Sequence, residues 1–136
     1  MMAKHKTIDH EADIGLEVNG KTLEELFKNA ASGLFSLLVD LKNVKPEVGK
    51  KLEITGNGEL LFNFLNELLY LWDTEGFIPK EFSLRIENDR LTGNVIGGLF
   101  DPLRHTIKKE IKAVTYHEFS LTREKGICKA RFILDV

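Results

Sequence analysis

Three carboxylates and an imidazole lie within five consecutive positions near the start of this 136-residue chain. The stretch reads "TIDHEADIGLEVNG", and its reactive side chains are Asp9, His10, Glu11 and Asp13. A fully extended chain directs three of them, Asp9, Glu11 and Asp13, to the same face. Like charges this close repel each other unless a cation or open water offsets the repulsion. Because oxygen ligands suit hard cations, the cluster indicates a Ca²⁺ or Mg²⁺ site, and a solvated acidic strand edge is the alternative.

The C-terminus supplies two further anionic groups. Asp135 is the penultimate residue of a predicted strand, and the α-carboxylate of Val136 follows it. A chain end that falls within a strand is usually fixed in a sheet. If the first and last strands are neighbours, Asp13, Asp135 and the Val136 carboxylate converge. Three anionic groups in one place require a cation, so these residues are the predicted ligands of the metal.

The other nucleophiles and ligands give weaker patterns. Four histidines are present, and no spacing between them matches a zinc motif. His10 and His105 are the better candidates for chemistry, since each lies beside acidic or loop residues, whereas His5 is predicted to lie in a solvated tail. Cys128 alternates onto the apolar face of the last strand and is predicted as a core residue. No serine-hydrolase elbow and no phosphate-binding loop is present.

A short basic run precedes the last two predicted strands. It contains Lys108, Lys109 and Lys112, beside Arg104 and His105. A solvated strand edge is one interpretation of this run. A docking patch for an anionic surface or a protein partner is the other.

Composition limits the class of protein. The hydrophobic fraction is 43%, the charged fraction is 29%, and 19 Lys and Arg stand against 21 Asp and Glu. These values predict one ordinary domain over residues 1–136, and they argue against a protein that mainly coats nucleic acid. Contact with an RNA-bound partner is compatible with this balance. A single cysteine, no signal peptide and no membrane-length apolar stretch predict a cytoplasmic protein without a membrane segment.

Two amphipathic helices must position these groups. The first is predicted from "NGKTLEELFKNAASGLFSLLVD", in which Thr22 and Glu25 stand at capping-box spacing ahead of one apolar face. The second is predicted from "ELLFNFLNELLYLWDTEG", with Gly76 as its C-terminal stop and Pro79 preventing a restart.

The remaining elements are predicted as strands. Alternation of apolar residues and turn signals at Asn88-Asp89 and Lys125-Gly126 define most of them. The segment 97–110 is predicted as a loop. We therefore predict an α+β fold with a mixed, mostly antiparallel sheet and both helices packed on one face. The predicted strands cover residues 14–18, 50–55, 82–86, 91–96, 111–121 and 127–136.

Three stretches in fixed order resemble the archease family. They are "DHEADIG" (9–15), "FDPLRH" followed by "EIKAVTYH" (100–105 and 110–117), and the C-terminal "FILDV". With the two helices between them, the resemblance covers the chain from about Ile8 to Val136. It implies an archease-like single domain.

The resemblance also implies a function. Archeases are small cytoplasmic proteins that are not enzymes themselves and that activate the RtcB-type RNA ligase of tRNA splicing and repair. They promote guanylylation of that ligase and sustain its turnover. A role as chaperone or modulator of nucleic-acid methyltransferases is the second role implied for the family. The family's metal site, usually occupied by Ca²⁺, implies Asp13, Asp135 and Val136 as ligands here, with Mg²⁺ or another hard divalent cation as the alternative.

The predicted partner contacts surround this site. They comprise Asp9, His10, His105 and Lys112. Two positions depart from the family pattern: Glu11 replaces a common Thr, and Gly98 replaces a common acidic residue. Two other classes of function stay open, a metal-dependent hydrolase with His10 or His105 as base near a bound Mg²⁺, and a methyltransferase-binding module.

Overall fold

The computed structural model describes the chain over residues 5–10 and 13–136. Along the chain, two α-helices alternate with strands before a closing run of four strands. The short 3₁₀ helix η1, Leu41–Asn43, follows the first α-helix. The strands are β1 (His5–His10), β2 (Asp13–Gly20), β3 (Val48–Thr55), β4 (Phe77–Glu87), β5 (Arg90–Leu99), β6 (Ala113–Glu124) and β7 (Ile127–Asp135), and the helices are α1 (Leu23–Leu38) and α2 (Leu60–Glu75).

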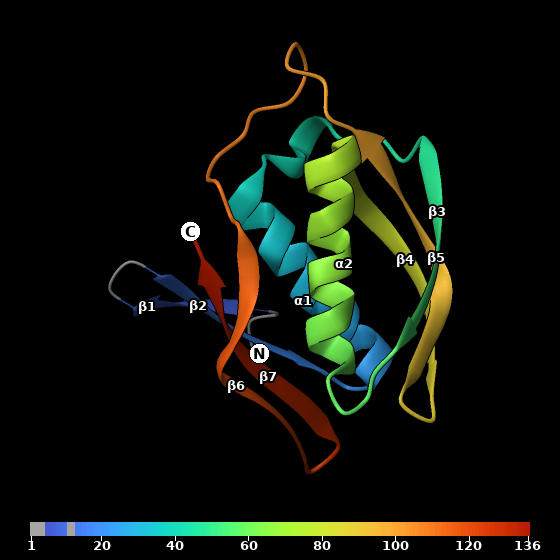
Figure 1. Cartoon of the computed structure of the whole chain (residues 1–136), viewed down its shortest axis with the longest axis vertical. Coiled ribbons are helices and arrows are strands. Elements are labelled where there is room, and N and C mark those ends of the chain that lie inside the picture. Colours follow the sequence, from blue (N-terminus) through green and yellow to red (C-terminus); the bar gives the residue numbers. More distant parts are fainter. Residues whose placement is uncertain (1–4, 11–12) are drawn as a thin grey trace.

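The strands form two antiparallel sheets, and the two helices lie between them (Figure 1). One sheet has the order β1-β2-β7-β6, and the other has the order β3-β5-β4. The α+β class is confirmed, but the structure has two sheets where one mixed sheet was predicted. The physical reason is the width of the apolar faces. α1 contacts β2 and β4, and α2 contacts β6, β3 and β4, so each helix is covered from both sides.

Helix α1 begins and ends where its sequence signals predict. The Oγ1 of Thr22 accepts a hydrogen bond from the N–H of Glu25 at 3.1 Å, and the Glu25 carboxylate accepts one from the N–H of Lys21 at 3.3 Å. These bonds satisfy donors that a helix N-terminus leaves free. Gly20 precedes this cap, and an added Cβ would lie 2.5 Å from the N atom of Leu26. Glycine therefore allows β2 to run directly against the first turn of α1.

Helix α2 ends at Gly76, as predicted, in a left-handed conformation with φ of 72°. Two asparagines within α2 bind the neighbouring strands. The Asn63 amide donates to the carbonyls of Thr55 and Gly56, both at 3.1 Å.

Neither α-helix of the described residues is long and apolar enough to cross a membrane.

The second asparagine, Asn66, completes the edge of β6. Its Nδ2 donates to the carbonyl of Val114 at 3.2 Å, and its Oδ1 accepts the N–H of Val114 at 3.0 Å. Val114 is buried, so its main-chain groups need partners inside the protein. The side chain of Asn66 thus supplies both hydrogen bonds that an adjacent strand would otherwise provide.

The N-terminal hairpin was not predicted. His5 begins β1, opposite Val18 of β2. Its ring packs close to α1, since a Cβ added to Gly33 would lie 3.2 Å from the His5 ring. The predicted solvated tail at His5 is therefore wrong. The chain also reverses after His10, whose partner in the ladder is Asp13. Residues 9–13 are therefore not one extended segment, and the alternation argument that placed Asp9 and Asp13 on one face does not hold.

Strand β5 is longer than predicted. Gly97 and Gly98 pair with β4 instead of starting the loop. A Cβ at Gly98 would lie 3.0 Å from the carbonyl oxygen of Lys45, so a larger residue would push against the segment after α1. Glycine at position 98, which departs from the family pattern, therefore allows two main-chain segments to pack closely.

Asn66→Ala tests the asparagine that completes β6. We expect the free energy of unfolding to fall by about 2–4 kcal/mol, because two hydrogen bonds are lost and two buried main-chain groups stay unpaired. Urea denaturation followed by circular dichroism measures the change. Glu67→Ala, at the next position of α2, is the control and should alter stability far less. Equal stability of the two variants would contradict this role of Asn66.

Candidate functional site

The pairing of β2 with β7 brings the two predicted side-chain ligands to one end of a sheet. Ile14 pairs with Leu134 in an antiparallel ladder. Asp13 precedes Ile14 and Asp135 follows Leu134, so both aspartates lie just beyond the last pair of this ladder, at the same end of the sheet. The sequence prediction required β2 and β7 to be neighbours, and this adjacency is confirmed.

Strand β6 holds Asp135 from the other side. Ala113 is the ladder partner of Asp135, and the N–H of Lys112 donates to the Asp135 carbonyl at 2.7 Å. The side chain of Lys112 is exposed at this position. Figure 1 shows the C-terminus beside the start of β6, at the end of the four-stranded sheet.

Strand β1 completes the row of residues at this end. Its last residue, His10, is the ladder partner of Asp13, and Asp9 is the partner of Ile14. The side chains of Asp9 and His10 lie outside the described part of the chain, as does Glu11 altogether. We call the sheet end formed by His10, Asp13, Lys112, Asp135 and Val136 the acidic end.

The donor set of the acidic end fits a hard cation. Asp13 and Asp135 are half-buried, and within the described residues neither carboxylate forms an ion pair or a side-chain hydrogen bond. Val136 is half-buried and packs against the hydrophobic core, which holds the chain end in place. Carboxylate oxygens are the ligands that Ca²⁺ and Mg²⁺ prefer.

No group of three His, Cys, Asp or Glu side chains capable of holding a metal occurs in the described part of the chain. The predicted set differs from such a group, because it has two side chains and one terminal carboxylate. Its binding of a metal stays a prediction.

His105 does not reach the acidic end. Its side chain is only 5% exposed, and its Nδ1 accepts the N–H of Asp101 at 2.9 Å. Its Nε2 lies 3.2 Å from the carbonyl of Asn43, and because a carbonyl only accepts, Nε2 carries the proton. Both ring nitrogens are therefore used within the protein. The predicted role of His105 in contacting a partner is replaced by a structural one.

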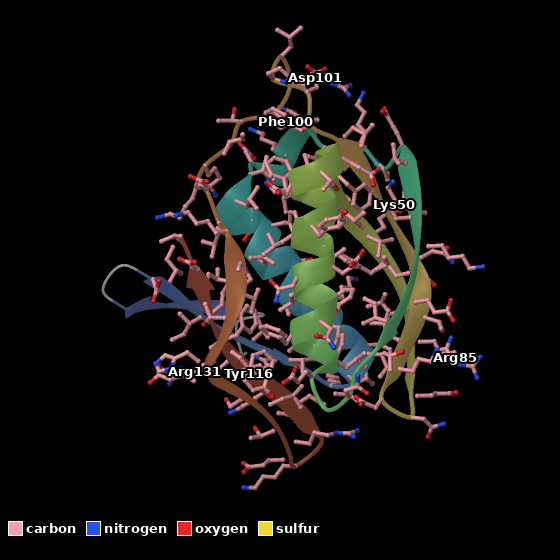
Figure 2. The ribbon with its side chains drawn as sticks, in the orientation of Figure 1. Lys50, Arg85, Phe100, Asp101, Tyr116 and Arg131 are labelled. Carbon is pink, nitrogen blue, oxygen red and sulfur yellow. The ribbon has the colours of Figure 1, made fainter. Side chains whose placement is uncertain are left out.

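The loop that contains His105 lies away from the chain terminus. Figure 2 labels Phe100 and Asp101 at the top of the molecule, and Figure 1, in the same orientation, places the C-terminus lower and to the left. The basic run is tied to the end of α1, since Lys108 donates from its N–H to Leu38 and from Nζ to Ser36. Lys108 therefore belongs to this loop and not to a strand edge.

One cavity, of about 750 Å³, lies where both helices begin. It is lined by Thr22 and Leu23 of the first helix start, by Leu60 of the second and by Arg123 near the far end of β6. One acidic residue of its rim is already engaged, since Glu24 accepts the N–H of Ile86 at 3.2 Å. The cavity is therefore at the opposite end of β6 from the acidic end and contributes nothing to it.

Comparisons with known proteins identify the relatives of this chain. The model of the Archease protein family (MTH1598/TM1083) matches residues 5–136. Protein archease of Pyrococcus furiosus is 38% identical over 142 residues, covering 99% of this chain and 100% of that protein. Protein archease of Archaeoglobus fulgidus is 39% identical over 129 residues, covering 90% and 93%.

Two solved structures resemble the fold. The solution structure of Methanobacterium thermoautotrophicum protein 1598 has a TM-score of 0.86 and 35% identity, and covers 99% of this chain and 100% of its own. The crystal structure of an archease from Thermotoga maritima, described as a possible chaperone, has a TM-score of 0.61 and 24% identity, with 96% of each chain covered. The second likeness supports the fold alone.

Asp13→Asn tests the predicted metal ligands. The change keeps the shape of the side chain but removes one of three negative charges. Substitution of a residue that only hydrogen-bonds a metal ligand lowers metal affinity about 10–100-fold. We therefore expect loss of a ligand charge to lower Ca²⁺ affinity by at least about tenfold while the fold persists. Isothermal titration calorimetry measures the affinity. Asp73→Asn, on the exposed face of α2, is the control, and a parent protein that binds neither Ca²⁺ nor Mg²⁺ would overturn the prediction.

Extending the chain beyond Val136 tests the third ligand. Two added residues move the terminal charge away and leave a neutral carbonyl, which can bind Ca²⁺ but contributes no full charge. We expect weaker Ca²⁺ binding by calorimetry, whereas the same two residues placed before Met1 should leave the affinity unchanged. Equal affinities of the two extended proteins would show that the Val136 carboxylate is not a ligand.

Proposed function

Since the chain belongs to the archease family, we propose that it is a metal-binding accessory protein that activates an RtcB-type RNA ligase in the cytoplasm. It promotes guanylylation of the ligase and sustains its turnover, and it has no active site of its own. The observation that supports this proposal is the pairing of Ile14 with Leu134, which brings the strand ends that carry Asp13 and Asp135 to the same end of a sheet.

The chemistry of the acidic end suits work beside a nucleotide site. Asp13, Asp135 and the Val136 carboxylate would hold a Ca²⁺ ion, or Mg²⁺ in its place. A bound divalent cation supplies positive charge to phosphate oxygens. The exposed side chain of Lys112 adds a second positive group, and the main-chain bond from Lys112 to Asp135 keeps it close. The acidic end would therefore dock where the ligase binds its nucleotide and would help to position metal and phosphate there.

The hydrolase alternative is weakened by the geometry of His105. A general base needs a free ring nitrogen within reach of the proton it removes. Both nitrogens of His105 are bonded to main-chain groups, and the ring is buried. The hydrolase alternative would therefore depend on His10 alone as base, and catalysis by the purified protein without the ligase would be its signature.

A chaperone role is the second candidate. The Thermotoga maritima archease, which shares the fold, is itself described as a possible chaperone. A module that binds nucleic-acid methyltransferases would be the form of this role. Such a protein would leave the ligase unaffected, so one assay separates the two candidates.

The ligase assay uses a limiting amount of the cognate RtcB-type ligase with excess RNA substrate. Catalytic amounts of this protein should convert single-turnover ligation into multiple turnover and should speed guanylylation. Asp13→Ala and Lys112→Ala should each lower activation by about tenfold or more, since each removes a charged group of the proposed working surface.

Lys42→Ala, an exposed position of η1 with no part in the acidic end, is the matched control and should activate like the parent. Failure of the parent protein to stimulate the ligase would reject the proposed function. Parental activation by both Asp13→Ala and Lys112→Ala would show that the acidic end is not the working surface.

A further inference from the structure

The loop between β5 and β6 presents an apolar side chain almost completely to water. We call residues 100–109 the apex loop, whose labelled residues Phe100 and Asp101 lie at the top of Figure 2. Leu103 in this loop is 94% exposed, and Ile107 is 51% exposed. Leu99, the last residue of β5, is 47% exposed. Exposed apolar side chains scattered singly are common on protein surfaces, and here three fall within nine positions of one strand end and the loop that follows it.

The turn that carries Leu103 is locked by Asp101. The Asp101 carboxylate accepts the N–H of Leu103 at 2.9 Å, and its carbonyl accepts the N–H groups of Arg104 at 3.0 Å and His105 at 2.7 Å. The second carboxylate oxygen lies 3.4 Å from the Nε of Arg104. The turn therefore holds one conformation before any partner arrives.

The apex loop is also fixed to the body of the protein. Buried His105 joins Asp101 to the carbonyl of Asn43. Phe100 packs edge-on against Trp72 of α2, with ring centroids 5.6 Å apart. On the far side, the N–H of Asp40 donates to the carbonyl of Thr106 at 2.9 Å. These contacts fix Leu103 in a position exposed to water. This exposed position gives no stability to the isolated protein.

Rigid exposed apolar groups are suited to binding. Ordering a mobile side chain or loop on association costs conformational entropy, and a fixed turn avoids much of that cost. The side chains that dominate protein interfaces insert into pockets that exclude water. Leu103 has the geometry of such an inserting group.

The charge around Leu103 indicates the partner. Residues 100–109 carry three basic side chains and one acidic one, a net charge of +2, although the whole chain is −2. The rest of the chain is therefore −4. The Asp101 carboxylate is occupied within the turn, whereas Lys109 is exposed. A surface with this character complements a negatively charged partner.

We propose that the apex loop is a docking surface for a protein partner that has an apolar pocket rimmed by acidic residues, with Leu103 inserted in the pocket. Lys109 and its neighbours face the acidic rim. A protein fits better than RNA, because a phosphate backbone needs the cations but offers no pocket for Leu103 and Ile107. This proposal rests on the proposed function, because it takes the ligase as the partner. It adds a contact that is separate from the acidic end.

Leu103→Ser tests the inserted side chain, with affinity for the cognate RtcB-type ligase measured by isothermal titration calorimetry. We expect the Kd to rise by about 10–30-fold, the usual range for an interface anchor. At saturating concentrations, ligation turnover should reach the parental value, because the acidic end is intact. Tyr70→Ser, which removes an exposed ring from α2, should leave the Kd unchanged, and circular dichroism should show parental folding of both variants.

Lys109→Glu tests the charge, with Lys51→Glu on β3 as its control. Lys109→Glu alone should raise the Kd, and the difference should shrink at high salt. A parental Kd for Leu103→Ser would overturn the proposal while leaving activation through the acidic end in place. Reduced RNA binding by Lys109→Glu, together with a parental ligase Kd for Leu103→Ser, would also overturn it and assign the loop to RNA. A parent protein that neither binds nor activates the ligase would reject both proposals.

Discussion

The antiparallel pairing of β2 with β7 is the constraint on which the rest of the structure depends. It joins Ile14 to Leu134, residues from opposite ends of the chain. Contacts this distant in sequence close a long loop and are made only when buried apolar area offsets the lost chain entropy. Here the inner faces of the two strands supply fully buried Leu16 and Phe132, which belong to the same core as α1. The same pairing brings the first hairpin to the chain terminus.

Local signals were sufficient to predict the helices and most turns. The Thr22 cap and the Gly76 stop each act within a few residues, so their effect can be seen in the sequence itself. Both residues of the Asn88-Asp89 turn have positive φ, as a tight hairpin requires. The division of the strands into two sheets could not be predicted in this way. Which strand pairs with which is decided by long-range packing of α1 and α2, and alternation within a strand carries no information about its neighbour.

The polar residues inside the fold were the hardest to interpret. Asn66 interrupts an apolar helix, where the sequence predicts no role for it, and His105 lies in an irregular stretch, where the sequence suggested a reactive role. Their partners are 48 and 62 residues away. Buried polar groups are kept when a hydrogen bond replaces water, and that bond is invisible until the chain is folded. The position of Asp13 and Asp135 at the same end of one sheet was predictable for the opposite reason, because both stand at strand ends and needed only that one strand pairing.

One continuous segment, residues 100–114, connects the apex loop to Lys112 of the acidic end, and that segment is held at both ends. At its start, Phe100 rests on Trp72 of α2. At its end, Lys112 hydrogen-bonds Asp135, and two residues later Asn66 of the same helix holds Val114. Helix α2 therefore fixes the position of the apex loop and of the acidic end together. A partner that touches both surfaces meets two sites already set in relation to each other, so its binding energy need not be used to order this segment.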